Sequence, residues 1–345
     1  MMYHQMPIPP RSEHLWRYTP WHRIHPSKPD VVPSADGIVF KTQNNVSLIE
    51  TSSESTSSEI ARTFLHECEG SSYNLSLDNI SEPIHINARC SGHVSVGSLH
   101  VEVKGSAVLF IHLTGEPEWA GIHITGTVHP NSKLFYGFIN ELDSNAKFLR
   151  CEDWILQRDA SMENATLSLG GFRCKTDIRS SLNGTGASLR QAITVNANGA
   201  QHDDEHVEIH HHHGHTYSDL VMYTACGGSS HFIGTGLLTI AEGANKTDAS
   251  QVFRNLLLSE KARAEAIPEL EVLADDVSAA HGAASAPVDS EQMHYLMSRG
   301  LNPKDAQSMI VSGFLNDSFS NLTNTTLIEE MRTRLTVHLE CELKR

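Results

Sequence analysis

The sequence HVEIHHHHGHTYSDL, at residues 206–220, contains four consecutive histidines. Imidazole is a common protein ligand of zinc, iron, nickel and copper, so the run is a candidate metal site. A strand over residues 206–213 would place four polar side chains on one face: His206, Glu208, His210 and His212. The candidate metal ligands in this set are Glu208, His210 and His212. The alternative is a structural ladder, in which the histidines hydrogen-bond to neighbouring strands.

Other patterns give weaker signals of chemistry. Cys226 lies beside two glycines in TACGGSSH, but a reactive thiolate needs a cationic or dipolar neighbour, so we expect a structural cysteine. Asp275 and Asp276 are adjacent, and on a strand they would point to opposite faces and could not act as a paired acid and base. The chain contains no Walker A sequence, so we do not expect it to hydrolyse ATP.

Charge and composition exclude several classes of partner. The 345-residue chain has 26 basic and 41 acidic residues and a formal net charge of −15, which opposes binding to nucleic acid or anionic membranes. Six scattered cysteines without a C-x-x-C pair favour a reducing compartment over a disulfide scaffold. The sequence shows neither a signal-peptide core nor an apolar run of about 18 residues. We therefore expect a cytoplasmic protein that binds neither nucleic acid nor a membrane.

The elements that position these residues fall into three segments. Residues 1–69 are rich in Pro, Arg, His and Trp and predict short helices and a loop at 51–59. Residues 70–286 contain short alternating runs of Val, Ile, Leu and Thr between Gly, Asn and Asp. Such strands build a sandwich, a large barrel, a propeller or a parallel β-helix, and the lack of strict repeats disfavours the propeller. Residues 287–345 have the helical period and predict a C-terminal helical domain.

Three longer sequences are distinctive in their order and spacing. They are SEHLWRYTP at 12–20, KTDASQVFRNLLLSEKARAEAIPELEVLADDVSAAHGAA at 246–284 and YLMSRGLNPKDAQSMIVSGFLNDSF at 295–319. Together they resemble the SufB/SufD family, components of the SUF machinery that assembles iron–sulfur clusters. The resemblance implies a mainly β fold, a right-handed parallel β-helix with flanking helical segments.

Within this family the chain is more similar to SufD than to SufB. Phe253 and Gly282 stand where SufB is expected to carry a cysteine and a glutamate, which are the ligands that a nascent cluster would use. One departure, SMIVSGF at 308–314, reads more like SufB.

A SufD-like subunit would be a non-enzymatic scaffold for cluster assembly. The resemblance implies pairing with a SufB-like paralogue, with His281 at the interface facing a SufB cysteine. It also implies binding of the ATPase SufC through the C-terminal helices, with four candidate contact residues: Tyr295, Arg299, Met309 and Phe314. No cofactor is expected to be held permanently, but iron or a cluster in transit could rest at the SufB interface. When the chain is alone, we expect a homodimer formed through its terminal coils.

Two alternatives stay open at this point. A homodimeric SufBD-type scaffold would work with SufC alone, although the missing cysteine and glutamate argue against it. A histidine-rich metal-binding β-protein would instead use the ligands Glu208, His210 and His212, and would contain stoichiometric metal.

Overall fold

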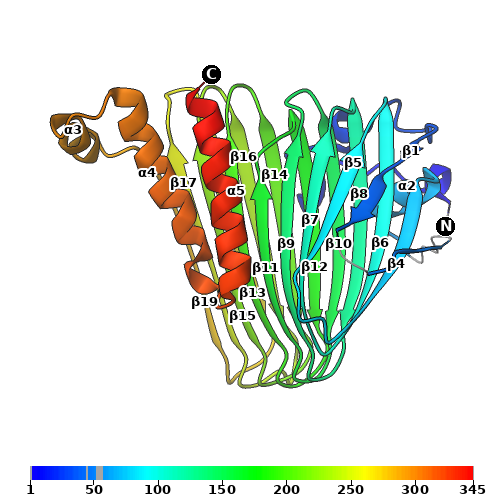
Figure 1. Ribbon diagram of the computed structural model, residues 1–345. Coiled ribbons are helices and arrows are strands. Elements are labelled where there is room, and N and C mark those ends of the chain that lie inside the picture. The colour runs from blue at the N-terminus through cyan, green and yellow to red at the C-terminus, as the bar shows by residue number, and fades with distance from the viewer. Residues whose placement is uncertain (1, 44–45, 52–56, 345) are drawn as a thin grey trace.

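The computed structural model describes residues 2–43, 46–51 and 57–344, and its body is a β-helix of two stacked sheets (Figure 1). In spatial order the first sheet contains β18 (Arg263–Val272), β16 (His231–Ile240), β14 (His202–His211), β12 (Arg173–Leu182), β10 (Lys147–Leu156), β8 (Trp119–Val128), β6 (Val94–Lys104), β4 (Ser71–Asp78) and β3 (Ile49–Glu50), with β1 (Asp36–Gly37) paired to β6. The second sheet contains β19 (Ser278–Pro287), β17 (Asp248–Leu257), β15 (Tyr217–Cys226), β13 (Ser188–Ala197), β11 (Ser161–Ser168), β9 (Lys133–Leu142), β7 (Ser106–Gly115), β5 (Ile84–Cys90) and β2 (Val39–Thr42). We call them the even sheet and the odd sheet.

Each coil of the β-helix adds one strand to each sheet. From β4 onward every strand pairs in parallel with the strand one coil further on, whereas β2 and β3 pair antiparallel to β5 and β4. The mainly β fold with a parallel β-helix, predicted from the sequence, is confirmed. In the described part of the chain, no helix is both long and apolar enough to cross a membrane.

Alternation of side chains explains why these sequences stack as coils. In β12, Cys174, Ile178 and Leu182 point between the two sheets and are fully buried, while Lys175 and Asp177 point to the outer face. Inward apolar side chains of both sheets form one continuous core along the axis of the β-helix. Burying each Ile or Leu in this way contributes about 1.5–3 kcal/mol.

The N-terminal segment covers the outer face of the even sheet. It contains η1 (Tyr3–Gln5), η2 (His14–Trp16), α1 (Trp21–Ile24) and α2 (Ile60–Glu67). Trp16, Trp21 and Phe64 form an aromatic cluster with Trp119 of β8, whose indole N–H donates to the carbonyl of Ile24 at 2.6 Å. Of the loop predicted at 51–59, residues 52–56 lie outside the described part of the chain.

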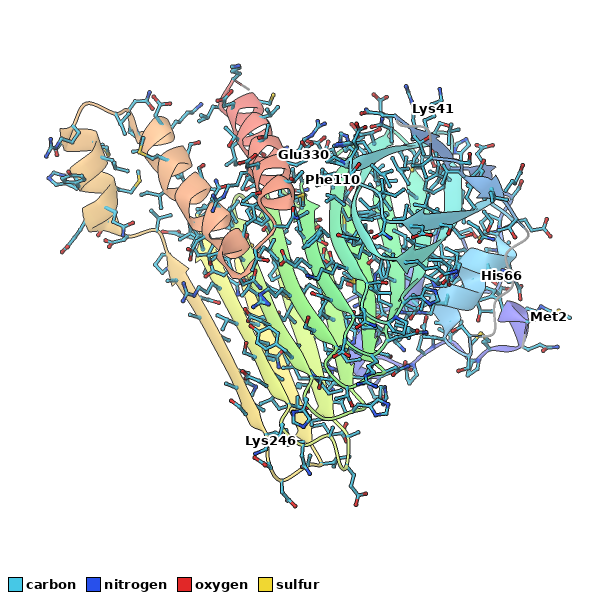
Figure 2. All side chains as sticks on the ribbon, turned by 60° about the horizontal axis from the view of Figure 1, so that its bottom comes forward. Met2, Lys41, His66, Phe110, Lys246 and Glu330 are labelled. Carbon is cyan, nitrogen blue, oxygen red and sulfur yellow. The ribbon has the colours of Figure 1, made fainter. Side chains whose placement is uncertain are left out.

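The C-terminal helices cover the outer face of the odd sheet. They are α3 (Ser290–Ser298), α4 (Pro303–Asp317), η3 (Ser318–Asn321) and α5 (Thr325–Leu343). The buried residues of α5 recur every four positions (Leu327, Met331, Leu335 and Leu339) and pack over Phe110 of β7 (Figure 2, where Phe110 and the neighbouring Glu330 are labelled). By contrast, α3 has no buried residue and stands away from the body (Figure 1).

Candidate functional site

The histidine run lies at the end of β14 and continues into the following turn. His206, Glu208 and His210 face outward, and Val207, Ile209 and His211 face the core. The strand predicted over residues 206–213 is too long, because β14 ends at His211 and His212 begins the turn. The turn after it contains Gly214 and His215, and His215 adopts a φ of 58°.

The outward side chains form a hydrogen-bonded ladder. His206 Nδ1 is 2.7 Å from Thr235 Oγ1 on the next coil, and His206 Nε2 is 3.0 Å from Glu208 Oε1. The second oxygen of Glu208 is 3.0 Å from His210 Nε2, and the Arg179 guanidinium lies at 3.8 Å. Although burial opposes ionisation, these hydrogen bonds and the Arg179 charge hold the pKa of Glu208 well below its usual range.

The remaining histidines of the run do not complete a metal site. The ring of His212 stacks against that of His210 with centroids 6.1 Å apart. His211 is buried and bonds Thr216 and Ser218, and burial lowers its pKa to about 4. Among the residues that the structure describes, no three His, Cys, Asp or Glu side chains are arranged to hold a metal ion. The ladder is therefore present in the structure, and a metal at Glu208, His210 and His212 stays a prediction.

The weaker candidates from the sequence, Cys226 and the adjacent Asp275 and Asp276, lie where they contribute to the fold. Cys226 is fully buried, and burial raises the pKa of its thiol to about 12, in keeping with a structural cysteine. Asp275 and Asp276 lie in the bend between β18 and β19 and not on a strand, so the argument from strand faces does not apply to them. Asp276 instead forms an ion pair with Lys246, which is labelled in Figure 2 at the turn end of the strands.

His281 lies on β19, the last strand of the odd sheet. In register it pairs with Gln251 of β17, so it continues a column of inward-facing positions through Leu220 and Gln191. No described strand follows β19, and the His281 side chain is exposed at the open end of the β-helix. A side chain added at the neighbouring Gly282 would meet nothing within 4 Å. This open surface leaves room for another molecule to reach the imidazole.

A groove of about 940 Å³ separates α3 and α4 from the last strands of the odd sheet. Of the four predicted SufC contacts, Tyr295, Met309 and Phe314 line this groove. Arg299 does not line it, and instead holds its guanidinium 5.2 Å from the ring centre of Tyr295. Tyr295 and Met309 are more than half exposed, which leaves apolar surface uncovered on both helices.

Three buried cations form ion pairs that were not identified from the sequence. Arg62 of α2 contacts Asp153 at 2.7 Å and Asp177 at 2.5 Å on the outer face of the even sheet. Lys175 meets Asp204 at 2.8 Å on the same face. The third pair, Arg150 and Glu152 at 2.6 Å, lies inside the β-helix. Arg62 and Asp177 are 115 positions apart, and no local sequence signal connects them.

Comparison with known proteins identifies the family. Residues 85–314 match the model of the SufBD core domain of the SUF iron–sulfur cluster assembly system. The iron–sulfur cluster assembly protein SufD of Escherichia coli is 29% identical over 229 residues, covering 66% of this chain and 53% of that protein. SufD of Bacillus subtilis is 29% identical over 215 residues, covering 62% and 48%.

A SufBD family protein of Mycobacterium tuberculosis is 27% identical over 277 residues, covering 77% of this chain and 68% of the relative. The chain thus spans about half the length of the two SufD proteins that it matches. Since the family model covers two thirds of the chain, from the first strands of the β-helix to α4, the chain belongs to the SufBD family of SUF iron–sulfur cluster assembly proteins.

Proposed function

We propose that this chain is a SufD-like scaffold subunit that pairs with a SufB-like paralogue and binds the ATPase SufC. The observation that carries the proposal is the open end of the β-helix, where β18 and β19 each have a hydrogen-bonded strand on one side only among the described residues. An unpaired strand edge exposes backbone N–H and C=O groups that can pair with another chain. The small residues Ala280, Gly282 and Ala284 allow that chain to approach closely.

His281 would supply one ligand at this interface. A neutral imidazole can occupy one coordination position on iron while the partner provides thiolate and carboxylate. The ligand set would then be complete only when both subunits are present, so iron or a cluster would rest there in transit. This chain would hold no permanent cofactor.

The groove beside α3 and α4 would receive SufC. Met309, Ile310 and Phe314 give its α4 wall an apolar surface, and Tyr295 faces it from α3. An amphipathic element of the partner can bury its apolar side chains in such a groove. Because α3 has no buried residue, it can adjust its position without disturbing the core.

The test is co-expression with candidate SufB and SufC proteins, anaerobic purification, and assay of iron and acid-labile sulfide. We expect a ternary complex with this chain and SufB in equal amounts. Loss of SufC, but not of SufB, should follow deletion of residues 289–320. A variant that retains SufC without that segment would contradict the assignment of the groove.

A homodimeric scaffold that works with SufC alone is the second candidate, because the open edge could also accept a copy of this chain. The side chain at position 253 argues against independent cluster assembly: Phe253 is fully buried in the core of the β-helix and offers no ligand. We expect a homodimer in the absence of SufB, measured by light scattering, that exchanges into a heterodimer when SufB is added. A homodimer that persists in excess SufB and assembles clusters with SufC would favour the second candidate.

A further inference from the structure

Charged side chains on the outer face of the even sheet are matched from one coil to the next. Lys175 of β12 pairs in register with Asp204 of β14, and their charged groups lie 2.8 Å apart. Arg179 of β12 pairs in register with Glu208 of β14, with 3.8 Å between nitrogen and oxygen. Opposite charges that face each other on adjacent strands stabilise a sheet, whereas like charges destabilise it. The central coils therefore satisfy a charge on one strand with a charge on the next strand.

The last strand of the even sheet, β18, departs from this pattern. Its alternate residues pack against the core, for example Leu270. Its outward positions therefore hold one basic and three acidic residues: Arg263, Glu265, Glu269 and Glu271. Glu269 lies in register with Leu237 of β16, and its charge has no charged neighbour there. Glu271 lies in register with Thr239, which is also uncharged. Among the described residues no strand lies on the other side of β18.

The three carboxylates of β18 are ordered but accessible. His231 of β16 lies 2.9 Å from Glu265, whose side chain is 41% exposed. His14 of the N-terminal segment lies 3.1 Å from Glu269, whose side chain is 45% exposed. Glu271 is exposed, and within the described part of the chain its carboxylate has no hydrogen bond or ion pair. Another molecule can therefore reach this acidic row.

The neighbouring open strand, β19, has a different composition. Its sequence, SAAHGAASAP, contains no Lys, Arg, Asp or Glu. A strand that paired with β19 would meet small side chains and one histidine, which discriminate little between acidic and basic partners. Discrimination by charge at the open end of the β-helix therefore depends on β18.

We propose that the acidic outer face of β18 selects the partner at this end: it accepts a partner strand with Lys or Arg at its outward positions and disfavours a second copy of this chain. This selectivity rests on the proposed function, since the partner must add its strand to this edge. A strand beside β18 would lie about 4.8 Å away, so its outward side chains would face Glu269 and Glu271 directly. Basic residues there would continue the charge matching of the central coils. A second copy would instead present its own three carboxylates and one guanidinium, so that net negative charge would face net negative charge.

The test is a charge reversal at Glu271, measured on self-association and on partner binding. Glu271→Lys should fold normally, because the side chain is exposed and has no bonded partner among the described residues. In sedimentation equilibrium of this chain alone, we expect the variant to self-associate roughly fivefold more tightly than the wild-type protein, because a repulsive contact becomes attractive. In calorimetry with a candidate SufB protein, we expect binding to weaken roughly fivefold. Glu82→Lys makes the same change of charge on the exposed turn between β4 and β5 and should alter neither association.

Salt provides a second measurement on the wild-type protein. Raising sodium chloride from about 0.05 M to about 0.5 M shortens the range of exposed charges. Self-association should therefore become tighter, because a repulsion is screened, while binding to SufB should become weaker, because an attraction is screened. Changes of the same sign in both associations would overturn the selectivity.

The two arms of the test separate this selectivity from the proposed function. If Glu271→Lys tightens self-association but the wild-type chain does not bind SufB, the proposed function fails and the discrimination against a second copy stands. Equal self-association of Glu271→Lys and Glu82→Lys would overturn that discrimination. Unchanged or tighter binding of SufB by Glu271→Lys would show that the partner strand is not basic, and would overturn the assignment of its chemistry.

Discussion

The central coils and the terminal coil of this β-helix use polar side chains in opposite ways. On β12 and β14, the charged groups Asp177, Lys175 and Asp204 are at most 3% exposed, and each has a partner within 2.8 Å. On β18 and β19, Glu269 and His281 are accessible and the strand edges are open. The same coil geometry thus holds paired, buried charges in its middle and exposes polar side chains and strand edges at its end. Pairing in the middle stabilises the subunit, whereas β18 and β19 each have a paired strand on one side only among the described residues.

The largest effect on folding is expected when a closed ion pair is opened. Arg62→Met keeps the aliphatic stem but leaves Asp177, which is fully buried, without its closest cation. Arg179 remains 3.0 Å from Asp177, so the buried carboxylate keeps one cation and loses one charged hydrogen-bond partner. We therefore expect a loss of about 1.5–3 kcal/mol in chemical denaturation. Arg158→Met, which breaks the exposed pair with Asp159, should cost under about 1 kcal/mol. If the two variants lost the same free energy of unfolding, the buried ion pairs beneath the N-terminal segment would stabilise the protein no more than an exposed pair does.

A smaller effect is expected at a buried carboxyl group that lacks a cation. Asp203 of β14 points into the core with one oxygen unpaired, and burial followed by the neighbouring Glu205 raises its pKa to about 8. The folded state therefore keeps a proton that the unfolded chain, with a pKa near 3.9, has released. Stability contributed by this group is complete below about pH 4 and declines as pH rises toward 8.

Asp203→Asn should remove this decline. The buried His202 and His211, whose pKa values burial lowers to about 4, contribute the same slope to the wild-type protein and to the variant, so the difference between the two reports on position 203. Between pH 6.5 and 8 we expect the wild-type protein to lose about 1–2 kcal/mol relative to the variant, measured by urea denaturation. An exposed change of the same type, Asp248→Asn, should leave the slope unaltered. If Asp203→Asn has the wild-type slope, the carboxyl group is ionised in the folded protein.

The sequence predicted the coils better than it predicted the contacts between them. Alternating Val, Ile, Leu and Thr with turn residues was enough to identify short strands, because burial of one strand face imposes a period of two. Their stacking as a β-helix was implied only by the family resemblance. The same period extended the predicted strand to residue 213, two residues beyond its end at His211, because the corner that follows depends on the left-handed conformation of His215. The pair of Arg62 and Asp177 required the path of the whole chain. Position 281 was identified through family resemblance, because an isolated histidine among small residues has no signal of its own.

The groove beside α3 and α4 is lined by exposed apolar side chains, so we expect substitutions there to affect partner binding more than folding. Met309→Asp places a charge on an exposed apolar side chain of the groove, so we expect folding stability to change by less than about 0.5 kcal/mol. SufC affinity should fall at least about tenfold in calorimetry, because an unpaired charge would be buried in the interface. Val337→Asp alters an equally exposed apolar residue on α5, outside the groove, and should leave SufC binding in place.

The smallest effect on folding, and the sharpest contrast with Arg62, is expected at His281. Its side chain is exposed, with no hydrogen bond or ion pair to another described residue, so His281→Ala should change the free energy of unfolding by less than about 0.5 kcal/mol. Under the proposed function, assembly with SufB and SufC should persist, because the interface would be held by strand edges and not by this imidazole. Iron and sulfide content of the complex purified from cells should nevertheless fall several-fold, because one ligand of the shared set is lost. The matched control is His212→Ala, whose ring stacks on His210 at the end of the ladder and contacts no open strand edge. If His212→Ala abolished cluster formation while His281→Ala retained it, the metal chemistry would lie at the histidine run that follows β14 and not at the exposed strand β19.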